Sequence, residues 1–179
     1  TAAWHDLGTV LKELHLHEEA VDVLRKAVDI DVNNALTHYY LGAALAMAAR
    51  PHEAVESYRR AVELDPALPG GHIGLGHVLK TVGDQSGGIK AYERAIELRP
   101  NYGETYYSLA NLKTFRFSAE QIASMETRLA NDKLPTECRV HFAFALAKAY
   151  EDAGNFDQSF HHRSKIKTYL EKKKEKTIQ

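Results

Sequence analysis

The sequence predicts an all-α protein, a solenoid of about five helical hairpins. The segment AVESYRRAVELDP at 54–66 recurs as GIKAYERAIELRP at 88–100, and an earlier copy, AVDVLRKAVDIDV, lies at 20–32. Successive copies are therefore 34 residues apart, and small residues return at the same places of each copy. A fixed period of this length is typical of helix pairs that stack on their neighbours. The alternative, an ordinary helical bundle, would leave this register unexplained.

Three regular copies are predicted over 1–102, with boundaries 1–34, 35–68 and 69–102. Two helices of one hairpin approach closely only where their side chains are small, and larger apolar residues fill the space around that contact. Proline cannot continue a helix, so Pro66 and Pro100 are expected to close the second helix of a copy. The small places are 8, 20 and 27, filled by Gly8, Gly42 and Gly76, by Ala20, Ala54 and Gly88, and by Ala27, Ala61 and Ala95.

The remaining chain departs from the regular pattern. We expect a divergent fourth hairpin over 103–136, in which Ile122 and Leu129 replace the small residues. Its second helix should begin after Ser118, with Gln121 completing a capping box, and should pack through Ile122, Met125 and Leu129. A divergent fifth hairpin follows over 137–170. Beyond it, 171–179 forms a charged tail that continues the last helix. The basic residues from Arg163 to Lys176 are interpreted as a solvated helix end rather than a contact with phosphates or an acidic partner.

The filled places resemble the tetratricopeptide repeat over residues 1–102. The resemblance implies a right-handed solenoid whose first helices line a concave groove that binds a peptide or protein. The residues that carry the resemblance are Trp4, Leu7, Gly8, Ala20, Ala27, Gly42, Tyr58 and Pro66.

The expected groove residues mix aromatic, amide and imidazole groups. Tyrosine contributes contact area at low entropy cost, and an asparagine amide can bond a peptide backbone in both directions. The alternative is that these side chains pack against further repeats or another domain. The family's basic clamp for a C-terminal carboxylate is not expected, because its positions hold His5, Thr9, Tyr40, Gly70 and Gly74 here. The candidate groove residues are His5, Thr9, Tyr39, Ala43, Met47, Ile73, His77, Lys80, Tyr107, Asn111 and Phe115.

Composition argues against several other classes of function. The net charge of −1 gives no general attraction to nucleic acid or to a membrane surface. The single cysteine, Cys138, indicates a reducing, cytoplasmic compartment and no disulfide framework. The histidines lack the spacing of a zinc site, and no phosphate loop follows a strand, so we expect no metal, no cofactor and no catalytic residue in this chain.

A narrower resemblance concerns LANLKTFRFS at 109–118 and RVHFAFALAKAYEDAGNFDQSFHH at 139–162. These strings are similar to the junction segment of bacterial proteins that join tetratricopeptide repeats to a C-terminal sulfotransferase domain. The resemblance implies that the intact protein transfers a sulfuryl group from PAPS, with its catalytic domain outside this chain. The alternative is an adaptor that assembles a bacterial secretion or polysaccharide-export complex. We also expect that the first helix pair exposes apolar surface if an upstream repeat was removed, and that it can then associate end to end with another copy as a consequence of the truncation.

Overall fold

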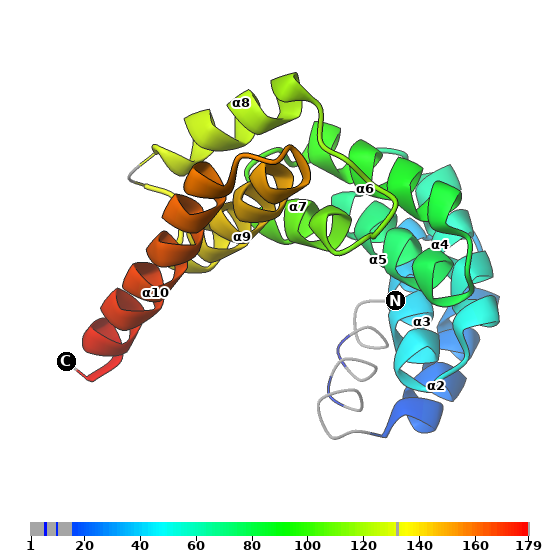
Figure 1. Cartoon of the computed structure of the whole chain (residues 1–179). Coiled ribbons are helices and arrows are strands. Elements are labelled where there is room, and N and C mark those ends of the chain that lie inside the picture. The colour runs from blue at the N-terminus through cyan, green and yellow to red at the C-terminus, as the bar shows by residue number, and fades with distance from the viewer. Residues whose placement is uncertain (1–5, 7–9, 11–15, 132, 179) are drawn as a thin grey trace. The chain divides into compact units, whose positions relative to one another are not determined.

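The computed structural model describes residues 16–131 and 133–178, together with Asp6 and Val10, and all regular structure in these ranges is helical (Figure 1). The chain divides into two compact units, Thr1–Leu98 and Arg99–Gln179. Unit 1 contains α2 (His17–Ile30), α3 (Ala35–Met47), α4 (Pro51–Leu64), α5 (Pro69–Thr81) and α6 (Gln85–Leu98). Unit 2 contains α7 (Gly103–Ala110), α8 (Ala119–Leu129), α9 (Thr136–Asp152) and α10 (Phe156–Ile178). No helix in these described ranges combines the length and the apolar character needed to cross a membrane.

Unit 1 is built from helical hairpins that meet where the sequence keeps its residues small. Helix α3 pairs with α4 and α5 pairs with α6, while α4 also packs on α5. A Cβ added to Gly88 would lie 3.2 Å from the backbone oxygen of Gly76, so the two helices of this hairpin nearly touch at places 8 and 20. The expected close contact between these two places is confirmed.

Tyrosine rings from the second helices cover the glycines of the first. A Cβ at Gly42 would lie 2.9 Å from the Tyr58 ring, and one at Gly76 would lie 2.6 Å from the Tyr92 ring. Both tyrosines are buried, with Tyr92 fully inaccessible to solvent. Place 8 is small because an aromatic ring occupies the volume that its side chain would need.

The residue at place 4 joins each copy to the one before it. The Nε2–H of His38 donates to the carbonyl of Val32 at 2.9 Å, and that of His72 donates to the carbonyl of Pro66 at 3.0 Å. In unit 2 the Tyr106 hydroxyl donates to the carbonyl of Pro100 at 3.2 Å. The donor follows the acceptor by six residues each time. This recurring place-4 hydrogen bond satisfies a carbonyl left open in the turn between helices.

Unit 2 is organised around α9, against which α7, α8 and α10 all pack. This differs from the expected fourth hairpin over 103–136, because α7 and α8 take α9 rather than each other as their main partner. Two features explain the difference. Helix α7 ends after eight residues, and α8 carries Ile122 and Leu129 where a hairpin needs small side chains. Conversely, Gly103 lets α7 approach α9, since a Cβ there would lie 2.6 Å from the Cys138 carbonyl oxygen.

The limits of α8 and α10 follow local signals in the sequence. Ser118 caps α8, accepting a hydrogen bond from the Gln121 backbone while the Gln121 side chain accepts one from the Ser118 backbone. The predicted capping box is therefore confirmed, and Met125 and Leu129 are buried as expected. Gly154, at φ 74°, turns the chain from α9 into α10. The 171–178 segment of the expected tail is helical.

We expect Gly74→Ala to destabilise unit 1, although alanine is normally favoured over glycine inside a helix by about 1 kcal/mol. A Cβ at Gly74 would lie 2.4 Å from the Tyr58 ring, a distance that forces the ring or the helix to move. The resulting overpacking should lower the free energy of unfolding by about 1–3 kcal/mol, measured by chemical denaturation.

A double-mutant cycle isolates this contact. In a Tyr58→Leu background the ring is gone, so adding Ala at Gly74 should no longer lower the free energy of unfolding. An equal loss in both backgrounds would mean that Gly74 is not constrained by Tyr58.

Candidate functional site

The expected groove residues of unit 1 lie on α3 and α5, two helices that pack together. Spacings of three and four residues place them on one face of each helix. We call these six residues the first-helix surface: Tyr39, Ala43 and Met47 on α3, with Ile73, His77 and Lys80 on α5. Met47 is 47% exposed and Lys80 is also exposed, whereas the other four are half-buried. His5 and Thr9 lie outside the described residues.

Tyr39 links the two helices of this surface. Its ring lies 5.1 Å from the Tyr40 ring and 6.0 Å from the Tyr58 ring, measured between centroids. It also covers Gly70 of α5, where an added Cβ would lie 3.2 Å from the ring. Burial, with a smaller contribution from Tyr40, raises the pKa of Tyr39 above its ordinary value. The phenol is therefore neutral at physiological pH and presents a fixed aromatic edge with one hydroxyl.

His77 is held by the second helix of its own hairpin. Its Nδ1 lies 2.8 Å from the Tyr92 hydroxyl, and the two rings meet edge to face with centroids 5.4 Å apart. This anchoring fixes the imidazole, so a peptide at the first-helix surface would meet a preorganised side chain.

The groove residues expected in unit 2 separate into different environments. Tyr107 packs against His141 and Phe144, with ring centroids 5.3 Å and 4.6 Å away. Asn111 follows the last residue of α7, and its side-chain amide donates to the Tyr107 carbonyl at 3.0 Å. Phe115 lies beyond α7 and packs edge to face on Phe117. The expectation that the first helix carries Phe115 is corrected, because α7 ends at Ala110.

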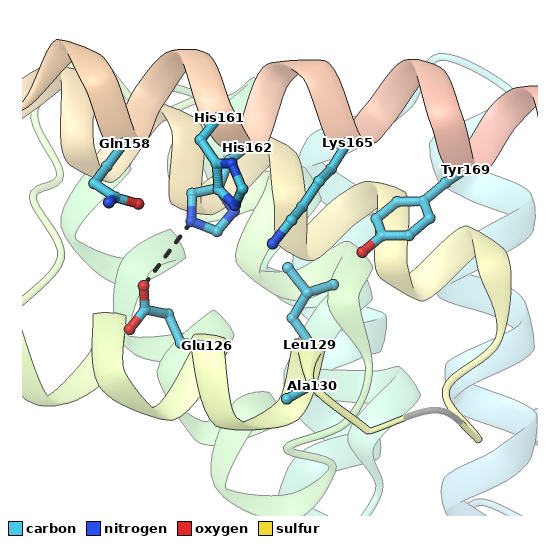
Figure 2. Close-up of a pocket in the computed structure, with 8 residues that line it drawn as sticks. All are labelled: Glu126, Leu129, Ala130, Gln158, His161, His162, Lys165 and Tyr169. Carbon is cyan, nitrogen blue, oxygen red and sulfur yellow. Dashed lines mark ion pairs between the residues drawn. The ribbon is translucent and has the colours of Figure 1, made fainter.

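A pocket of about 180 Å³ lies between α8 and α10, and none of the predicted groove residues lines it (Figure 2). Leu129 and Ala130 give it an apolar side, while most of the remaining groups are polar or charged. No sequence pattern indicates this pocket, because its lining residues come from α8 and α10, which are separated in the chain by the whole of α9. Its lining residues are Glu126, Leu129, Ala130, Gln158, His161, His162, Lys165 and Tyr169.

Glu126 is the negative group of the α8–α10 pocket. Its Oε1 accepts a hydrogen bond of 2.6 Å from the Tyr150 hydroxyl, which raises the pKa of Tyr150 to about 12. The same oxygen lies 3.9 Å from Nε2 of His162, the contact drawn as a dashed line in Figure 2. His162 is only 3% exposed and stacks on Tyr150, with ring centroids 5.6 Å apart.

His162 is neutral near pH 7 although the Glu126 carboxylate lies close to it. Burial, followed by the charges of Lys165 and His161, lowers its pKa to about 4, and this outweighs the opposite effect of Glu126. The contact with Glu126 is therefore not an ion pair under physiological conditions. Its Nδ1 is buried and has no hydrogen-bond partner among the described residues.

We predict that acidification destabilises the protein through His162. Because its pKa is lower in the folded chain than the ordinary 6.5, the unfolded chain binds the proton first as the pH falls. The stabilising contribution is complete above pH 6.5 and is lost as the pH falls toward 4. The loss should reach at most about 3 kcal/mol in the free energy of unfolding, followed by circular dichroism in denaturant.

Substitutions at two adjacent histidines separate this effect from general acid denaturation. His162→Gln should show a shallower decline of stability over this pH range. His161→Gln, a change at the exposed neighbour, should leave most of the steep decline in place, because burial is the largest cause of the lowered His162 pKa and His161 is a smaller one. Equal pH dependence in His162→Gln and the unmodified protein would show that His162 is not the titrating group.

In the part of the chain that the structure describes, no three His, Cys, Asp or Glu side chains lie close enough together to hold a metal ion. The described groups of both surfaces are instead suited to hydrogen bonds, apolar contact and single charges. Such an arrangement can bind a ligand.

Comparisons with known proteins identify the repeats. Models of the tetratricopeptide repeat match residues 1–34, 35–68 and 71–102. A crystal structure of MamA has a TM-score of 0.70 at 24% identity, over 96% of this chain and 97% of that one. YrrB, described as a TPR protein with an unusual peptide-binding site, has a TM-score of 0.68 at 18% identity, over 93% of this chain and 84% of that one.

A partial match is the second TPR of Spaghetti (RPAP3) bound to an HSP90 peptide. It has a TM-score of 0.53 at 18% identity, over 55% of this chain and 91% of that one. No curated protein matches the chain in sequence. At these identities the solved structures establish a shared fold, whereas the repeat models establish the family. This chain is a tetratricopeptide repeat protein.

Proposed function

We propose that this chain is a scaffold that binds a peptide or protein segment at the first-helix surface of unit 1. The observation that carries the proposal is the exposure of Met47 and Lys80 on the same helix faces as the anchored rings of Tyr39 and His77. Rigid aromatic groups next to adaptable side chains are typical of peptide-binding surfaces. The peptide named for RPAP3 and the peptide-binding site named for YrrB support this use of the fold.

The chemistry of the surface favours one kind of peptide. Tyr39, Ala43, Met47 and Ile73 offer apolar contact, Lys80 supplies a positive charge, and none of the six residues is acidic. We infer that the ligand presents apolar side chains, with an acidic group placed near Lys80. An extended segment could contact both helices because Tyr39 lies across α3 and α5.

Selection from a displayed peptide library, followed by fluorescence anisotropy, tests this proposal. Met47→Ser and Lys80→Ala should each weaken binding of the selected peptide by about tenfold, since each removes a contact worth about 1.4 kcal/mol. Both side chains are exposed, so the free energy of unfolding should change by no more than about 0.5 kcal/mol.

Glu56→Gln on α4 is the matched control, because Glu56 is exposed but does not belong to the first-helix surface. It should leave the affinity unchanged. Peptides that bind this control and both surface variants with equal affinity would place the binding site elsewhere.

We further propose that the chain is the N-terminal arm of a larger bacterial sulfotransferase that uses PAPS and acts in the cytoplasm. This rests on the resemblance of 109–118 and 139–162 to the junction segment of such proteins. The early end of α7 at Ala110 and the capped start of α8 at Ser118 fall within the first of these strings or at its boundary, where the regular repeat is interrupted. No residue of this chain is assigned to catalysis.

The coding sequence after the codon for Gln179 tests the sulfotransferase proposal. A strand, a phosphate-binding loop containing Gly and Arg, and a helix would support it, and binding of PAPS by the full-length protein would follow. Further repeats or a stop codon would contradict it. The alternative, an adaptor for secretion or polysaccharide export, then takes its place. Sedimentation velocity at increasing concentration tests whether the chain self-associates end to end.

A further inference from the structure

We propose that the α8–α10 pocket binds a small zwitterion, and that its ligand class is the free α-amino acids. This inference is independent of the peptide proposed for the first-helix surface, because the pocket is formed by unit 2 alone. It concerns a site that the repeat pattern does not indicate.

Opposite charges line the pocket without neutralising each other. Glu126 extends from α8 and Lys165 from α10, yet the two do not form an ion pair. The partners of Glu126 in the described structure are the Tyr150 hydroxyl and the ring of His162. Because His162 is neutral, neither partner cancels the negative charge. A ligand that enters the pocket therefore meets a negative group on one side and a positive group on the other.

The positive side of the pocket has two hydrogen-bond donors available. Figure 2 shows the Lys165 ammonium and the Tyr169 hydroxyl reaching from α10 toward Leu129 of α8. Neither donates a hydrogen bond to a group within the described residues. The Arg139 guanidinium lies 5.7 Å from the centroid of the Tyr169 ring and helps to hold that ring in place. A carboxylate between Lys165 and Tyr169 would accept charge-assisted hydrogen bonds from both.

The two sides together select a ligand with both charges. A simple anion would gain Lys165 but would be repelled by Glu126, and a simple cation would face the reverse situation. An ammonium beside Glu126 and a carboxylate beside Lys165 and Tyr169 satisfy both groups. Leu129 and Ala130 provide apolar contact for the carbon atoms between them. The volume of about 180 Å³ fits a molecule of amino-acid size and excludes a folded peptide.

Isothermal titration calorimetry with each proteinogenic L-amino acid in turn tests the proposal. At least one amino acid should bind with a saturable signal, and amide NMR shifts should change in α8 and α10. Acetate and methylammonium each carry only one of the two charges, so they should bind about tenfold more weakly or worse. Acetate binding as tightly as the best amino acid would overturn the zwitterion proposal, as would the absence of binding by every amino acid.

Two variants of α10 localise the site. Lys165→Met keeps the length of the side chain but removes its charge, and it should weaken binding of the best amino acid by about tenfold or more. Lys167→Met is the matched control, because Lys167 has an 82% exposed side chain, pairs with Glu171 and does not line the pocket.

Glu126→Gln tests the other side, since an amide can still accept the Tyr150 hydrogen bond but lacks the charge. It should weaken binding of the same amino acid to a similar degree, while the free energy of unfolding of all three variants is measured alongside. Unchanged affinity in Lys165→Met, or an equal loss in Lys167→Met, would exclude the α8–α10 pocket as the binding site.

Discussion

Close approach of two helices at small residues is the constraint on which unit 1 depends. At Gly76 and Gly88 the backbones of α5 and α6 nearly touch, and at Gly42 the ring of Tyr58 fills the volume that a side chain would require. Backbones this close leave little freedom in the angle and distance between helices. The positions of Tyr39 and His77 follow from that geometry, because both rest on residues of the neighbouring helices. The geometry of the first-helix surface therefore depends on where glycines allow the helices to come close together.

The regular repeats and the start of α8 could be predicted from the sequence because their signals are local or periodic. Ser118 and Gln121 lie three residues apart, so their capping box needs no tertiary information. The pairing of α7 could not be predicted in this way. It depends on Gly103 meeting the Cys138 carbonyl on α9, a contact between residues far apart in the chain. Repeat periodicity instead favoured α8 as the partner, and it placed Phe115 on a helix that ends at Ala110.

The α8–α10 pocket could not be predicted from the sequence either, because it too depends on contacts between residues far apart in the chain. Glu126 and His162 occupy ordinary exposed and buried positions of two helices, and neither stands in a motif. Adjacent histidines on a helix point in different directions, which correctly indicates that His161 and His162 have different surroundings. The tertiary fold decides that His162 is buried against Tyr150 and remains uncharged beside a carboxylate. The charge balance of the pocket therefore depends on packing and cannot be obtained from residue counts.

The place-4 hydrogen bond has a consequence for how such an array can change by gene duplication. Donor and acceptor stand six residues apart, as in Val32 and His38 or Pro66 and His72, and they belong to different copies of the repeat. A recombination event that joined two arrays inside this six-residue segment could combine the turn of one array, which holds the carbonyl acceptor, with a place-4 residue of the other array that cannot donate to it. Breakpoints between the two helices of one hairpin would leave every such segment intact. The most readily inherited module is then offset from the repeat seen in the sequence: the second helix of one hairpin, the turn, and the first helix of the next.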